Sequence, residues 1–107
     1  MTNTRYAFVE LSETQSDIIA DAIATIGGMP SECELRMRGI QVAGMTLKAD
    51  ADTLLRLRNA VHANRPMLRR DQRNHTRVQN MLREAGHRIG VPRLPSLSSM
   101  RRQRGLS

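Results

Sequence analysis

Residues 33–61 read CELRMRGIQVAGMTLKADADTLLRLRNAV, and this stretch decides the fold because its apolar residues change period. In residues 33–38 apolar side chains alternate with charged ones, which is the pattern of a half-buried strand. The apolar positions switch phase after Gly39, so we expect a bulge or a turn there. A second break at residues 43–44 precedes a further strand that starts at Met45. The simplest arrangement makes the two strands antiparallel neighbours.

A helix is expected directly after the second of these strands. Asp50 or Asp52 can cap its first turn by accepting backbone hydrogen bonds. The apolar residues then recur at helical spacing: Leu54, Leu55, Leu57, Ala60 and Val61. This pattern predicts an amphipathic helix that buries one side.

The same order of strand and helix precedes this stretch. Residues 5–11 form a short stretch with aromatic and β-branched side chains, which favours a strand. Ser12 and Gln15 have the spacing of a capping box, and Gly27-Gly28 can end the helix that begins there. The apolar residues of this first helix share one side: Ile18, Ile19, Ala22, Ile23 and Ile26.

The predicted fold is therefore α+β, with a small antiparallel sheet in βαββα order and two amphipathic helices on one face. Free cysteines are usually buried, so we expect the lone Cys33 to point into the core. The other residues expected in the core are Ile19, Ile23, Leu35, Leu55 and Val61.

A third helix is predicted from Pro66 to about Ala85, with Gly86 as its stop. Residues 69–77 contain no apolar side chain, so the middle of this helix cannot bury an apolar face. We expect three parts within one domain-sized chain. They are a βαββα scaffold (residues 1–63), a basic helix (64–87) and an extended basic tail (88–107).

Charge is distributed unevenly along the chain. The 107 residues carry 17 basic and 10 acidic side chains, a net charge of +7. Residues 1–63 have a net charge of −2, whereas residues 64–107 hold eleven arginines against two acids, a net charge of +9. Sixteen of the 17 basic residues are arginine, which grips phosphates and carboxylates in a bidentate manner. A GC-rich genome would also favour arginine over lysine.

The sequence lacks the usual signs of an enzyme or a metal protein. No phosphate-binding loop, dinucleotide motif or nucleophile elbow occurs, and Cys33 has no second cysteine for a disulfide or a metal site. The three histidines stand 13 and 12 residues apart, which is not metal-ligand spacing. We expect no enzymatic activity and no cofactor. Because no apolar run approaches the ~20 residues of a membrane span, we expect a soluble cytoplasmic protein without a membrane partner.

The basic helix is the best candidate for a binding site. Arg65, Arg69, Arg73 and Arg77 are four residues apart, so one continuous helix would place them in a row about 18 Å long. Neighbouring like charges repel, and a polyanion would relieve that repulsion. The expected binding residues are Arg65, Arg69, Arg70, Arg73, Arg77, Arg101, Arg102 and Arg104.

The leading expectation is a small non-enzymatic binding protein that uses these arginines to engage DNA or RNA. The alternative is a regulator or inhibitor, of the kind that mobile elements encode, or an assembly component, that docks the same region on an acidic protein surface. In either case residues 1–63 would serve as a scaffold or as the surface of a homodimer.

Overall fold

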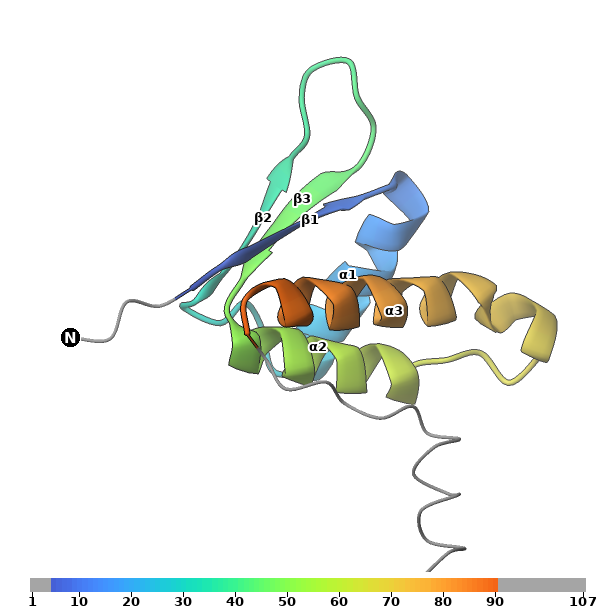
Figure 1. The fold of residues 1–107 in the computed structure, drawn as a ribbon. Coiled ribbons are helices and arrows are strands. Elements are labelled where there is room, and N and C mark those ends of the chain that lie inside the picture. The colour runs from blue at the N-terminus through green and yellow to red at the C-terminus, as the bar shows by residue number, and fades with distance from the viewer. Residues whose placement is uncertain (1–4, 91–107) are drawn as a thin grey trace, which may run out of the picture.

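The computed structural model describes residues 5–90 and confirms the α+β class with βαββα order (Figure 1). A 3-10 helix and a third α-helix follow the βαββα unit. The elements are β1 (Ala7–Leu11), α1 (Glu13–Thr25), β2 (Cys33–Met37), β3 (Met45–Ala49), α2 (Ala51–Ala63), the 3-10 helix η1 (Arg69–Gln72) and α3 (Arg73–Arg88).

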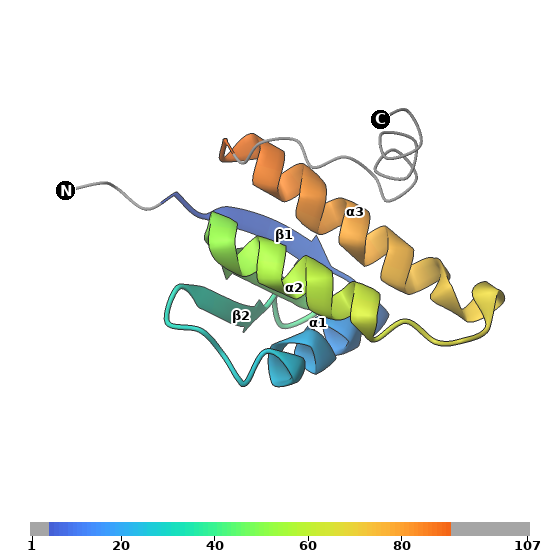
Figure 2. The ribbon, with the colours of Figure 1, turned by 90° about the horizontal axis from the view of Figure 1, so that it is seen from below.

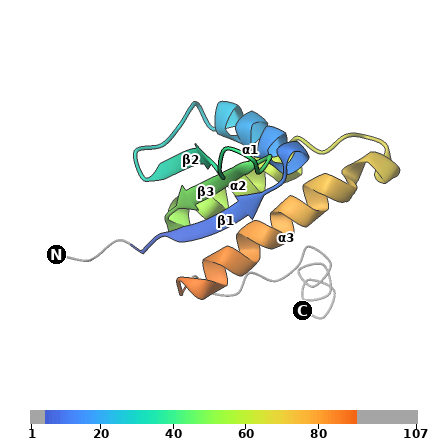
Figure 3. The same ribbon diagram turned by 90° about the horizontal axis from the view of Figure 1, so that it is seen from above.

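The sheet has three antiparallel strands, with β3 in the centre between β1 and β2. Leu47 of β3 lies opposite Val9 of β1 and Leu35 of β2, so these side chains share one face of the sheet. All three helices cover that face (Figures 2 and 3). On the other face Phe8 remains 60% exposed, because no helix of the described chain covers it.

The predicted helix caps are confirmed. Ser12 and Gln15 form a capping box, in which Gln15 N–H donates to the Ser12 hydroxyl and Ser12 N–H donates to the Gln15 side chain. The Asp50 carboxylate caps α2 by accepting from the Thr53 N–H at 3.0 Å. Gly27 and Gly28 follow α1 with positive φ angles, as expected for residues that end a helix.

The third helix belongs to the core, which the sequence analysis did not predict. Val78, Leu82 and Ala85 are fully buried and join the same apolar cluster as Ile19 and Leu57. α3 packs against α2, α1 and β1. The expected scaffold of residues 1–63 therefore contains only part of the core. The stretch without apolar residues lies on η1 and the start of α3, so it leaves the later turns free to pack.

The predicted limits of this helix are wrong at both ends. Leu68 has an extended backbone, with ψ of 126°, so no helix starts at Pro66. At the other end α3 continues through Gly86, which is buried, and closes at Arg88. Gly90, with φ of 88°, then takes the left-handed conformation expected after a helix. Arg88 is thus helical and not part of a tail, and residues 91–107 lie outside the described chain.

Three expectations for residues before α3 also need correction. Leu55 is not a core residue, because it lies on the exposed side of α2 and is 37% exposed. Cys33 and Leu35 pack against the core as expected but are only half-buried, since β2 is an edge strand with a neighbour on one side. Residues 38–44 form a loop that extends beyond the sheet, with Ile40 fully exposed, so of the bulge or turn expected at Gly39 the chain makes a turn and no bulge (Figure 1).

Gly44 should not tolerate a side chain. It adopts φ of +103°, which is costly for other residues, and a Cβ at this position would collide with the backbone carbonyl of Leu11. We expect Gly44→Ala to lower the free energy of unfolding by about 2–3 kcal/mol in urea titrations. Gly39→Ala is the matched control, because its Cβ would meet no atom within 4 Å and should change stability by less than about 0.5 kcal/mol. Equal effects of both changes would contradict the placement of this loop beside β1.

Candidate polyanion-binding surface

The predicted binding arginines that the structure describes lie on the connection from α2 to α3 and on the first turns of α3. Arg65 follows α2, and its Nε donates to the His62 carbonyl at 3.1 Å. The Gln72 amide donates to the Pro66 carbonyl at 2.7 Å, which ties η1 back to this connection. The arginines thus extend from a backbone segment that the chain holds by its own hydrogen bonds.

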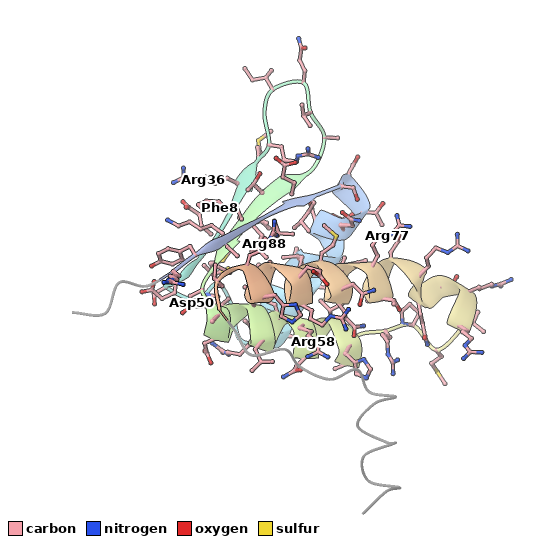
Figure 4. The ribbon with its side chains drawn as sticks, in the orientation of Figure 1. Phe8, Arg36, Asp50, Arg58, Arg77 and Arg88 are labelled. Atoms are coloured by element: carbon pink, nitrogen blue, oxygen red, sulfur yellow. The ribbon has the colours of Figure 1, made fainter. Side chains whose placement is uncertain are left out.

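The predicted row of arginines four residues apart is interrupted. Arg69 and Arg70 belong to η1, in which three residues make a turn, and Arg65 precedes any helical residue of this segment. Only Arg73 and Arg77 stand one α-helical turn apart. The five residues are nevertheless close in the chain. Figure 4 shows nitrogen-tipped side chains spreading from this end of the molecule, near the labelled Arg77.

None of these arginines is neutralised by the rest of the described chain. All five are exposed. The ion pairs within residues 5–90 involve other arginines, namely Arg36, Arg38 and Arg83. The first turn of α3 contains no acid and has no side-chain cap, so Arg73 stands where the helix dipole disfavours a cation. The positive charge at this end is therefore available to an external anion.

The same face of α3 carries one further arginine that the sequence analysis missed. Arg88 lies eleven residues, close to three full turns, after Arg77, so both project from nearly the same side of the helix. They border an open groove of about 860 Å³ along the edge strand β1 beside α3, which Phe8 and Met81 also line. The spacing of eleven residues between Arg77 and Arg88 can be read from the sequence. The expectation that the helix stops at Gly86 placed Arg88 outside the helix, so the two arginines were not grouped.

These arginines form one surface, the α3 basic face, which consists of Arg65, Arg69, Arg70, Arg73, Arg77 and Arg88. Glu84 also lines the groove, and its carboxylate lies 4.0 Å from Arg83. The other three predicted binding residues, Arg101, Arg102 and Arg104, lie outside the described residues.

The described part of the chain offers little for metal or nucleophilic chemistry. No group of three histidine, cysteine or acidic side chains comes together within residues 5–90. Burial raises the pKa of the Cys33 thiol, and the negative charge of Asp50 raises it further, so the reactive thiolate is disfavoured. Within the same residues, no helix is both long and apolar enough to cross a membrane.

Comparisons with protein-family models, with curated proteins and with solved structures find no match to this chain.

Proposed function

We propose that this protein binds nucleic acid through the α3 basic face, without catalysing a reaction. The observation that carries the proposal is the set of exposed arginines that has no acidic partner within the described chain. Unpaired surface arginines of this density attract phosphates and release condensed counterions when they bind. Arginine also suits phosphate because its planar fork donates two parallel hydrogen bonds.

The length of the α3 basic face suits a nucleic-acid backbone. Arg73, Arg77 and Arg88 fall within about 60° of one another around α3 and span about 22 Å along its axis. That distance covers several consecutive phosphates of a duplex. Only Tyr6 and Phe8 are aromatic, so stacking on successive unpaired bases contributes little. The geometry favours recognition of a duplex backbone over recognition of a single strand.

A second candidate is docking on an acidic protein surface, as a regulator, an inhibitor or an assembly component. Met67 and Leu68 favour it, because they lie among the arginines and are 99% and 56% exposed. Methionine and arginine are both enriched in protein interfaces. A duplex backbone offers no apolar surface against which Met67 and Leu68 could be buried.

Replacing Arg69, Arg73 and Arg77 together by Gln should weaken the binding of a mixed-sequence 20-mer duplex and reduce its salt dependence. Each lost duplex phosphate contact lowers the magnitude of the slope of log K against log salt by about 0.9, so the slope should fall by about 2 to 3. The loss should be uniform across sequences, since phosphate contacts carry no sequence information. Fluorescence anisotropy at several salt concentrations measures both quantities.

The matched control replaces Arg36, Arg38 and Arg56 by Gln. It removes the same charge from β2, the following loop and α2, away from the α3 basic face. This control should leave the slope within about 1 of the parent value. If neither the duplex nor an RNA hairpin binds the parent at tens of micromolar near 0.1 M salt, nucleic-acid binding is excluded and docking on an acidic protein becomes the better proposal.

A further inference from the structure

A second group of basic side chains lies where α2 and α3 pack against each other. The two helices meet at His62 and Gln79, whose side chains are 3.3 Å apart, from Nδ1 to Oε1. One turn earlier on α2 and one turn later on α3 stand Arg58 and Arg83. Burial lowers the pKa of Arg58, and the positive charge of Arg83 lowers it further. The packing of α2 against α3 therefore places an arginine from each helix on the same side of this contact.

On α3 this contact continues along a row of residues spaced by four, since such residues lie on one side of a helix. The row is His75, Gln79, Arg83 and His87. All of them are half-buried, as are their two counterparts on α2. We call the row and its two counterparts on α2 the α2–α3 seam. It comprises Arg58, His62, His75, Gln79, Arg83 and His87. All three histidines of the chain belong to it.

The α2–α3 seam contains no acidic residue. The nearest carboxylate to Arg83 is that of Glu84, which is 65% exposed and lies 4.0 Å away, at the limit of an ion pair. Arg58 makes no ion pair within residues 5–90. Two half-buried like charges destabilise the free protein when their one acidic neighbour within residues 5–90, Glu84, is exposed and reaches only Arg83, and an anion bound between them would reduce that cost.

Hydrogen bonding in the α2–α3 seam is also incomplete. Arg83 Nε, His87 Nε2 and His75 Nδ1 are buried and have no hydrogen-bond partner in the described chain. Buried polar nitrogens nearly always have a hydrogen-bond partner, from the protein, from ordered water or from a bound ligand. Three such atoms in one row show that residues 5–90 alone leave hydrogen-bonding capacity unused on this surface.

We propose that the α2–α3 seam is a binding site for a phosphate group, held between the guanidinium groups of Arg58 and Arg83. A phosphate fits better than a carboxylate, because its tetrahedrally arranged oxygens can accept from donors that approach from two helices. Its charge of −1.5 to −2 as a monoester compensates both arginines at once. The histidines flank the pair along the seam and can add donors to the same anion.

The proposed phosphate ligands Arg58 and Arg83 do not belong to the α3 basic face. Arg58 and Arg77 lie on opposite sides of α3 (Figure 4). The phosphate site therefore does not depend on nucleic-acid binding by the α3 basic face, and either proposal can fail without the other.

The test titrates the full-length chain with inorganic phosphate, at ionic strength held constant with sodium chloride, and follows backbone amide shifts by NMR. We expect saturable shifts on α2 and α3 around Arg58 and Arg83. Arg58→Gln and Arg83→Gln should each weaken phosphate binding by about tenfold or more, because each removes a charge-assisted hydrogen-bond donor. Arg58→Gln also relieves like-charge repulsion, so this variant should remain folded.

Two control variants separate the phosphate site from general charge effects. Arg56→Gln removes an exposed arginine from α2, and Arg77→Gln removes one from the α3 basic face. Both should keep phosphate affinity within about twofold of the parent, because neither residue belongs to the seam. Shifts that do not saturate, or that survive Arg58→Gln and Arg83→Gln unchanged, would overturn the proposal.

The source of the phosphate is distinguished by two further titrations. Adenosine monophosphate carries a monoester, whereas a thymidine dinucleotide carries only a backbone diester. If the monophosphate alone binds, the site serves free phosphate or nucleotides. If the dinucleotide binds as well and loses affinity in Arg58→Gln, the site can also receive a nucleic-acid backbone.

Discussion

A chain that ends at Asn64 should lose its cooperative unfolding transition. It would retain β1, α1, β2, β3 and α2 but lack Val78, Leu82 and Ala85, which are buried in the same core as Ile19. Removing the side chain of one buried leucine such as Leu82 costs about 2–5 kcal/mol. A domain of this size has only roughly 5–10 kcal/mol of total stability, so losing all of α3 should exhaust it.

Thermal and urea unfolding followed by circular dichroism would measure this effect. A chain that ends at Gly90 is the control, because it keeps every element described in the structure and should keep the parent's cooperative transition. A cooperative transition in the shorter chain would show that residues 1–64 fold alone. The α3 core residues would then be dispensable for the fold.

Ile19→Ala should cost about 3–4 kcal/mol and lower the thermal midpoint by roughly 15–25 °C. Ile19 is completely buried on α1, at the centre of the apolar cluster between the sheet and the helices. The surrounding side chains come from several elements and cannot all move to fill the cavity. Differential scanning calorimetry would provide the midpoint and urea titration the free energy of unfolding.

Leu55→Ala is the matched control for this substitution. The sequence pattern places Leu55 in the core, whereas the structure leaves it 37% exposed on α2. We therefore expect a loss below about 1 kcal/mol, well under that of Ile19→Ala. Equal losses for the two variants would contradict the orientation of α2.

Local signals in the sequence were sufficient for the elements before residue 64. The Ser12–Gln15 capping box and the Asp50 cap depend on side chains that reach backbone groups three residues away. The alternation that begins at Cys33 predicted a strand because a strand's own geometry sends successive side chains to opposite faces. Such signals need no knowledge of distant residues, which explains why the βαββα order could be predicted.

The arginines of the α3 basic face were predicted only in part. Arg73 and Arg77 were found from their spacing, and the structure keeps them on one helical face. The continuous row through Arg65 and Arg69 was wrong, because the connection tied by Gln72 to Pro66 replaces the expected first helical turns. A side-chain-to-backbone bond over six residues leaves no periodic trace in the sequence.

The sequence by itself determined the strands, the first two helices, their caps and the excess of arginine after residue 64. Only the tertiary structure decided that α3 completes the core, that Leu55 is exposed and that Arg58 lies within reach of the charge of Arg83. These outcomes depend on which side of each helix faces which neighbour, and residues far apart in the chain set that orientation jointly. Periodicity shows that a helix has an apolar side, but packing alone selects the partner that covers it.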